Sequence, residues 1–396
     1  MSPLTFMMRI RKEVIEINTN VKQPMRNTVL QEIRHLRGNE DFVIDQRNGN
    51  RYQVLVKEIL GHTAYCFSTP IYNSLTQKLV DRTFEKIQNG VFYRGSNGMV
   101  SICENRCVFE NSTGRVVLLL KEKPMTEKDG CDAVGGVVVV PTLNGVRFNV
   151  CGERLTIHLK SEIKQEGIRY NPACFSVMKE AFCPFLSVAT LYAKGENGVV
   201  EPVEMKYREL EGQTYELEFV NPLKKGTFVF EVNLYEPKLF QDTTVQSKYP
   251  DMNNAYGAIG FIGKTEAFGE QWLYLRPDFS KLSEVVSRRL EQVLLHMPVF
   301  NDCLETLDVF VPLKRFCSFG STWNKKENTT GKVTNAVRQN SYLTIDVTEM
   351  FSHRMEKTLI YNEGLILRKP KDREPFVPIA TGDCYMTPQI LEIKLK

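Results

Sequence analysis

The sequence predicts an all-β protein, built of tandem β-sandwich or jelly-roll domains behind a short helical N-terminal lead. Three observations favour this fold class. Short runs rich in Val, Ile, Tyr, Phe and Thr recur along the chain, Asn-Gly and similar turn signals separate them, and helical periodicity is sparse. The 396 residues suffice for two or three domains, and the 42% hydrophobic and 25% charged content is typical of globular chains.

The expected strands are short segments of β-branched and aromatic residues. They are residues 52–60, 91–93, 116–120, 136–140, 186–192, 215–220 and 227–234. Turn signals lie at residues 48–50, 96–98, 112–114, 143–145 and 196–198. Asn and Gly tolerate positive φ, so these turns predict hairpins and an antiparallel arrangement.

Two segments carry helical signal. Residues 27–36 place Val29, Leu30, Ile33 and Leu36 on one face, and Gly38 follows, which predicts a short helix. Residues 282–295 combine a helical spacing at their start with an extended pattern at their end. We expect a loop or a single helical turn there, leading into a strand.

The strand and turn pattern divides the chain into three expected domains. Residues 1–148 would form a β-rich N-terminal domain with the short helix, and residues 149–236 a small antiparallel β-sandwich. Residues 237–396 would form a third domain. Strands about ten residues apart in the second segment are typical of a small sandwich.

The charge balance narrows the classes of partner. Lys and Arg number 51 and Asp and Glu 47, giving a net charge of +4 without a basic stripe. Nucleic-acid binding usually needs such a stripe, so no nucleic acid is expected as a partner. The sequence contains no apolar run long enough for a membrane helix, and no classical secretory signal is evident at its start.

The last two-fifths of the chain carries an ordered series of motifs. An Asp-Thr-Thr-Val run begins at Asp242, a Trp-Leu-Tyr-Leu run at Trp272, an Ile-Asp-Val-Thr run at Ile345 and a Gly-Leu-Ile-Leu run at Gly364, with Trp323 between. This order resembles the DNRLRE family of β-jelly-roll domains over roughly residues 240–394. The resemblance implies a jelly roll of the kind found in large bacterial surface proteins and in related carbohydrate-binding modules, and hence a location outside the cell. The missing signal and the many cysteines favour the opposite, so the localisation stays open.

Exposed aromatic residues are the candidate ligand-binding groups. Aromatic rings can stack on sugar rings, although core packing is the competing interpretation for each of them. Trp272 lies in an extended apolar run, which favours packing, whereas Trp323 follows a Gly-Ser-Thr segment and is expected at a loop edge. The candidates are Trp323, Trp272, Tyr256 and Tyr385, with Tyr249 as a further ring to test.

Catalytic and metal-binding patterns are weak. No His pair has the spacing of a zinc site, and no nucleophile elbow, dinucleotide-binding or phosphate-binding motif is present. A Cys384 nucleophile with His353 and Asp383 is conceivable, but a structural cysteine is favoured. The acidic and amide side chains considered for calcium are Asp242, Asp251, Asn253, Asn254 and Asp383, and solvated turn residues are the favoured interpretation. We therefore expect no metal site and no cofactor. The ten cysteines lack any CxxC pair, which favours buried free thiols.

Three functional hypotheses follow. The leading one is a non-catalytic structural or adhesion component of a bacterial surface or phage-like assembly, whose β-domains serve as spacers and recognition surfaces. Its partners would be other protein subunits or cell-surface glycans. The alternatives are a lectin-like carbohydrate-binding protein and a polysaccharide-active enzyme.

Overall fold

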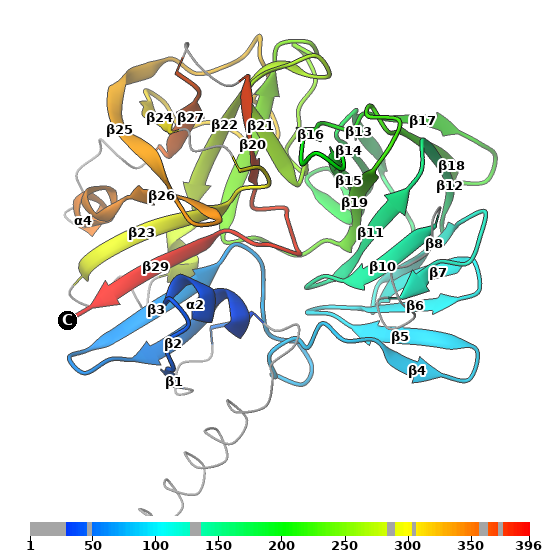
Figure 1. Cartoon of the computed structure of the whole chain (residues 1–396), viewed down its shortest axis with the longest axis horizontal. Helices are drawn as coiled ribbons and strands as arrows, with labels where there is room; N and C mark the ends of the chain where they lie inside the picture. The colour runs from blue at the N-terminus through cyan, green and yellow to red at the C-terminus, as the bar shows by residue number, and fades with distance from the viewer. Residues whose placement is uncertain are drawn as a thin grey trace, which may run out of the picture.

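The computed structural model describes residues 29–45, 50–126, 136–282, 290–302, 306–355, 363–370 and 375–396. Strands dominate these residues and form antiparallel sheets, which confirms the predicted all-β class. Figure 1 shows two lobes side by side, with the first strands and the last strand of the chain in the same lobe. We call this the terminal lobe and the other the middle lobe.

The middle lobe is a sandwich of two sheets. The first has the strand order β17 (Met205–Glu209), β18 (Thr214–Val220), β12 (Arg154–Ser161), β8 (Gly114–Leu119), β7 (Arg106–Asn111), β6 (Met99–Cys103), β5 (Gly90–Arg94) and β4 (Glu85–Ile87). The second has the order β13 (Gly167–Asn171), β14 (Cys174–Glu180), β15 (Cys183–Lys194), β19 (Thr227–Leu234), β11 (Gly145–Cys151), β10 (Val137–Pro141) and β9 (Met125–Thr126), with β16 (Val200–Glu201) beside β15. Inward-facing rings join the sheets: Phe219 of the first lies 4.4 Å from Phe230 of the second, centroid to centroid.

The terminal lobe is one long sheet folded over its own core. Its first half has the order β1 (Val43–Ile44), β2 (Gln53–Lys57), β3 (His62–Phe67), β29 (Ile390–Leu395), β23 (Leu290–Pro298) and β26 (Tyr342–Asp346). Its second half has the order β24 (Leu307–Pro312), β27 (Leu365–Arg368), β22 (Gly269–Pro277), β21 (Ile259–Thr265) and β28 (Phe376–Ala380), with β20 (Phe240–Gln246) beside β22. Strand β25 (Thr329–Gln339) pairs with β24 in one part and with β26 in the other, so it carries the sheet from one half to the next.

The helical segments of the described residues lie on the terminal lobe. Helix α2 (Leu30–Leu36) falls within the predicted helix, whose residues 27 and 28 lie outside the described ranges. Residues 282–295 were expected to form a loop or one helical turn that leads into a strand. Residues 283–289 of this segment lie outside the described ranges, the 3₁₀ turn η2 (Phe279–Leu282) precedes them, and β23 follows them. Helix α4 (Thr348–Met355) begins directly after β26. None of the helices in the described ranges has the length and apolar character needed to cross a bilayer.

The sheets group the chain differently from the three expected consecutive domains. The expected boundary between residues 148 and 149 falls inside β11, and strands on both sides of it share the middle lobe. Strands β2 and β3 belong to the terminal lobe, because β3 pairs with β29 from Phe67 opposite Ile390 to His62 opposite Leu395. The expected boundary between residues 236 and 237 lies in the connector from β19 to β20.

A broad apolar interface joins the lobes. The outer face of the second sheet of the middle lobe contributes buried side chains such as Leu191 and Val229. These pack in one cluster with Ile259 and Phe261 of β21 and Ala380 of β28. Burying both faces removes apolar area from water, so the lobes stabilise one another.

Candidate functional site

Strand alternation places aromatic residues on the outer face of the terminal lobe. In β22, Leu273 and Leu275 face the lobe core, while Trp272 and Tyr274 belong to a separate cluster on the opposite face. Successive side chains of a strand point to opposite faces, which produces this division. Phe310 of β24 and Trp323, from the loop before β25, pack against the same cluster. The structure therefore brings the two predicted tryptophans together.

Two cations cover the rings of these aromatic residues. The ring centroids of Trp272 and Trp323 are 5.1 Å apart. The Arg368 guanidinium lies 3.6 Å from the Trp272 centroid and 4.6 Å from that of Phe310. The Lys326 ammonium lies 3.8 Å from the Trp323 centroid and 5.2 Å from that of Trp272. We call these five residues the tryptophan platform.

The platform is fixed but still reaches solvent. Trp272, Trp323 and Phe310 are each half-buried. The Trp272 indole Nε1 donates a hydrogen bond to Glu270 Oε1 at 2.9 Å, which fixes the orientation of that ring. Each cation–π contact contributes on the order of 0.5–2 kcal/mol, depending on its exposure. The result is a preorganised surface with apolar ring area beside positive charge, which suits the apolar face of a sugar or an acidic group.

The other two predicted ring residues lie elsewhere. Tyr256 and Tyr385 are only 4% and 3% exposed, and both lie where the lobes meet. The Tyr256 hydroxyl donates to the Phe182 carbonyl at 3.1 Å, and the Tyr385 hydroxyl accepts from the Glu236 N–H at 3.2 Å. A role in stacking on a ligand does not fit this burial, because neither ring presents a face to solvent. Tyr249 is partly buried, with its hydroxyl bonded to Glu204.

The conceivable Cys384 nucleophile is enclosed in the same region. Cys384 is fully buried, and its Sγ lies 3.1 Å from Thr387 Oγ1. Burial raises the pKa of the Cys384 thiol to about 12, whereas a nucleophilic cysteine needs an accessible thiolate. The side chain of His353 lies outside the described residues. The structure thus supports the structural interpretation of Cys384.

The side chains considered for calcium instead make hydrogen bonds and ion pairs within the chain. Asp251 accepts a hydrogen bond from Asn324 at 2.9 Å, Asn254 donates to Thr244 at 2.6 Å, and Asn253 donates to two backbone carbonyls. Asp242 and Asp383 both face the ammonium of a lysine. Within the described ranges, no group of three or more His, Cys, Asp or Glu side chains is placed to hold a metal ion.

That lysine, Lys238, lies in the connector between the lobes, and we call Lys238, Asp242 and Asp383 the connector cluster. Its Nζ is 3.2 Å from Asp242 Oδ1 and in direct contact with Asp383 Oδ2. The side chains are 8%, 1% and 6% exposed. Burial acts to lower the pKa of Lys238, but the two carboxylates outweigh it and raise that pKa. Burial raises the pKa of Asp383 to about 7, against the opposing effect of Lys238. Asp242 and Asp383 were among the candidate calcium ligands, but their contact with Lys238 could not be predicted, because the three residues come from a strand, a distant turn and a connector.

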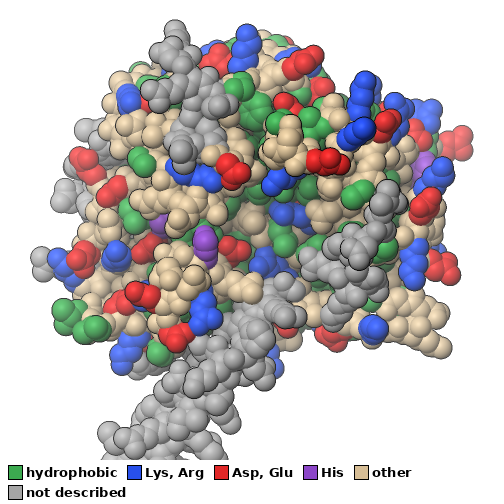
Figure 2. Space-filling view, viewed as in Figure 1, with side chains coloured by type: hydrophobic (Ala, Val, Ile, Leu, Met, Phe, Trp, Pro, Cys, Tyr) green, Lys and Arg blue, Asp and Glu red, His purple; other side chains and the backbone are tan. Residues whose placement is uncertain are grey.

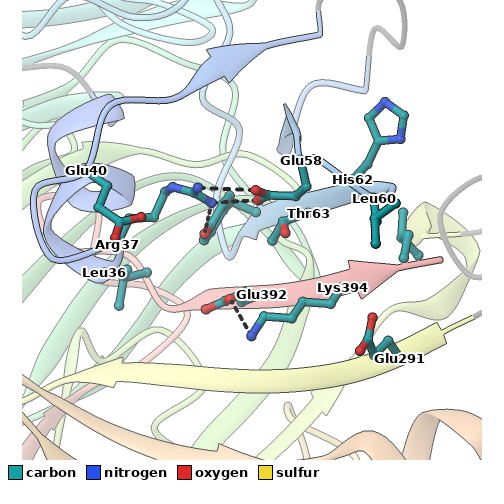
Figure 3. Close-up of a pocket in the computed structure, with 12 residues that line it drawn as sticks. Leu36, Arg37, Glu40, Glu58, Leu60, His62, Thr63, Glu291, Glu392 and Lys394 are labelled. Carbon is teal, nitrogen blue, oxygen red and sulfur yellow. Dashed lines mark hydrogen bonds and ion pairs between the residues drawn. The ribbon is translucent and has the colours of Figure 1, made fainter.

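A polar cleft of about 300 Å³ lies between α2, the β2–β3 hairpin, β29 and β23. Figure 3 shows the Arg37 side chain directed at Glu58, and Lys394 directed at Glu392. The Arg37 guanidinium donates to both Glu58 oxygens, at 2.7 and 3.3 Å. Both cations of the cleft are therefore already paired with carboxylates, and the cleft is a weaker candidate than the platform.

Figure 2 shows basic and acidic side chains interspersed over one face of the molecule.

No protein-family model matches the chain, and no curated protein is significantly similar to it.

Proposed function

We propose that this protein is a non-catalytic structural or adhesion component of a bacterial surface or phage-like assembly. Its two lobes serve as a spacer, and the tryptophan platform is its recognition surface. The single observation that carries this proposal is the pairing of Trp272 and Trp323 under two ordered cations on an outer sheet face. Aromatic residues and Arg are the residue types that most often dominate binding energy at recognition surfaces.

The spacer role is supported by how the lobes are joined. The apolar interface joins the lobes and the connector cluster ties the connector to the terminal lobe, so the connector is not a free hinge. A body of this kind holds a surface patch at a fixed distance and direction from its other end. The order of motifs that resembles the DNRLRE family is a further, independent support.

A second candidate function, lectin-like carbohydrate binding, is favoured by the same rings. Two adjacent half-buried indoles offer apolar area of the size that stacks on sugars, and such sites add a few polar groups that fix orientation. Arg368 and Lys326 would supply these groups, and they would favour glycans that carry carboxylate or phosphate groups over neutral ones.

The proposal is tested by a binding screen of the purified full-length protein. The probes are a glycan array, insoluble cell-wall polysaccharides, and immobilised surface-protein fractions. Trp323→Ala removes one platform ring. Tyr207→Ala is the matched control, because Tyr207 is an exposed strand aromatic, 38% accessible, on the middle lobe.

Saturable binding that is lost in Trp323→Ala and kept in Tyr207→Ala supports a platform-based recognition function. Binding to polysaccharide alone selects the lectin-like candidate, and binding to protein fractions alone selects the assembly component. Binding that survives Trp323→Ala, or no binding to any probe, contradicts the proposed recognition role of the platform.

A further inference from the structure

The connector cluster differs from the other lysine ion pairs of the described chain in how completely it excludes water. Lys238 and its two carboxylates are all at least nine-tenths buried. The pair of Lys281 with Asp278, by contrast, leaves 25% and 29% of those side chains exposed. Burying an ion pair costs desolvation energy that the mutual attraction only partly offsets. The cluster is therefore an unusual place for a permanent salt bridge.

Its members are also held in fixed positions. Asp242 Oδ2 accepts a hydrogen bond from the Gly382 N–H at 2.6 Å, which holds this carboxylate beside the turn that carries Asp383. That turn is anchored by Thr381, whose hydroxyl donates to the Gly257 carbonyl at 2.6 Å. The Lys238 backbone carbonyl accepts from Lys281. An amine, a carboxyl group in contact with it and a second carboxylate beside the amine are thus preorganised, as reactive groups must be.

We propose that Lys238 and Asp383 condense to an intramolecular isopeptide bond, with Asp242 transferring the protons. This modification site is independent of the proposed recognition function.

The reaction begins with a proton shift that leaves the net charge of the pair unchanged. The ammonium of Lys238 gives its proton to the Asp383 carboxylate, producing a neutral amine and a carboxylic acid. Burial and the neighbouring Asp242 raise the pKa of Asp383 despite the opposing charge of Lys238, which favours the protonated form relative to an exposed carboxyl group. The raised pKa of Lys238 keeps the ion pair as the resting form, so the neutral pair is the minor, reactive state.

The bond then forms without any other reactant. The Lys238 Nζ lone pair attacks the Asp383 carboxyl carbon, and the C–N bond forms while the C=O π electrons move to oxygen. Asp242, 3.2 Å from Nζ, accepts a proton from the nitrogen and returns it to the departing hydroxyl group. The C–OH bond breaks, one water leaves, and Asp242 ends unchanged. Two buried charges are replaced by a neutral amide, which removes their desolvation cost.

Two arginine pairs with buried carboxylates among the described residues cannot react in this way. Arg147 with Glu231, and Arg51 with Glu236, place a guanidinium opposite the carboxylate. A guanidinium stays protonated in proteins and so has no free nitrogen lone pair for attack. Of the lysine ion pairs in the described part of the chain, that of Lys238 is the one whose members are all at least nine-tenths buried.

The bond would clamp the junction of the lobes. Lys238 lies between β19 and β20, and Asp383 lies between β28 and β29. The amide would connect the segment just before β20, where the chain enters the second half of the terminal lobe, to the turn between β28 and β29. Such a tie resists pulling on the chain, because the segment between the two residues cannot be extended by force.

Intact mass spectrometry of the purified, denatured full-length protein tests the proposal. We expect a mass lower than that of the sequence by one water, and a tryptic digest that lacks cleavage after Lys238. The digest should instead contain a branched peptide joining the Lys238 and Asp383 segments. Lys238→Arg and Asp383→Ala should each have the full mass expected from its own sequence, without the loss of water. Asp242→Asn keeps both reacting groups and should also show no loss of water. Asp278→Asn, beside the exposed Lys281 pair, is the matched control and should retain the loss of water.

A wild-type protein of full sequence mass that trypsin cleaves after Lys238 overturns the proposal, whatever the variants do. A loss of water without the branched peptide also overturns it, because a cyclic imide elsewhere would give the same mass. Retention of the bond in Asp242→Asn overturns the role of Asp242.

Discussion

Glu231 carries a buried carboxylate that accepts several hydrogen bonds at the junction of the lobes. It accepts hydrogen bonds from Arg147 Nη2 at 2.9 Å, from the Asn233 amide at 2.9 Å and from the Tyr385 backbone N–H at 3.1 Å. Arg147 lies directly opposite Glu231 on β11. The Glu231 side chain is 0% exposed and the Arg147 side chain 11%. Because Tyr385 belongs to the terminal lobe, this carboxylate also joins the lobes. Glu231→Gln keeps the shape of the side chain and removes its charge.

We expect Glu231→Gln to lower the free energy of unfolding by about 3–5 kcal/mol, the usual cost of leaving one partner of a buried pair uncompensated. The matched control is Glu218→Gln. Glu218 pairs with Arg154 at a similar 2.8 Å, but these side chains are 30% and 65% exposed. Exposed pairs contribute about 0–1 kcal/mol, because water screens them.

The assay is urea-induced unfolding, followed both by far-ultraviolet circular dichroism and by tryptophan emission. The first signal reports the strands of both lobes, while both tryptophans of the chain lie in the terminal lobe. Coincident transitions would show that the lobes unfold together. A double replacement, Arg147→Met with Glu231→Leu, should recover most of the loss. Equal losses in Glu231→Gln and Glu218→Gln would refute the reasoning that burial sets the cost.

Three further outcomes are expected. Native-state alkylation should label the exposed Cys151 and Cys317, while the buried thiols, whose pKa burial raises to about 12, react only after unfolding; peptide mapping that shows uniform labelling would contradict this. Burial acts to raise the pKa of Glu58, but hydrogen bonds from Arg37 and Thr63, together with the charges of Arg37 and Lys394, outweigh it and hold that pKa below the usual 4.5. A carboxylate with a lowered folded-state pKa stabilises the protein above its usual pKa, and this contribution is lost as pH falls through the folded value. The stability difference between wild type and Glu58→Gln should therefore vanish in acid, and a difference that grows on acidification would be inconsistent with the pairing. Arg368→Ala should uncover the Trp272 ring, shift the tryptophan emission to the red and destabilise the lobe by about 0.5–2 kcal/mol, whereas unchanged emission would argue against the stacked geometry.

Local structure could be predicted from the sequence where interactions between neighbouring residues determine it. The turn at residues 96–98 joins β5 to β6, with the Gly95 N–H bonded to the Gly98 carbonyl, and the turn at residues 143–145 joins β10 to β11. The run at residues 227–234 is β19. The turn signal at residues 48–50 falls largely outside the described ranges.

The pairing of strands could not be predicted from the sequence in the same way. Residues 62–67 form β3, which was not among the expected strands, and nothing in their sequence specifies β29 as the partner. Period-two alternation tells which side chains share a face, not which strand lies alongside. For the same reason the expected domain boundary at residues 148 and 149 fell inside a hairpin strand of the middle lobe.

Part of the candidate site could be predicted from the sequence. Trp323 was expected at a loop edge, and it lies half-buried in the loop before β25. For Trp272 the apolar run predicted packing. The structure shows its ring half-buried on the outer face, because Leu273 and Leu275 take the inner one. Neither Arg368 nor Lys326 could be identified, since a cation above a ring is a property of the folded chain alone.

The most direct test of the proposed recognition role is a titration of the full-length protein with cell-wall polysaccharide and with surface-protein fractions, followed by tryptophan emission. Both tryptophans of the chain belong to the platform, so the signal arises at the proposed site. We expect a saturable emission change that disappears in Trp323→Ala and persists in Tyr207→Ala. Saturable binding detected by sedimentation without any change in emission would contradict the proposal, because the ligand would then be bound elsewhere.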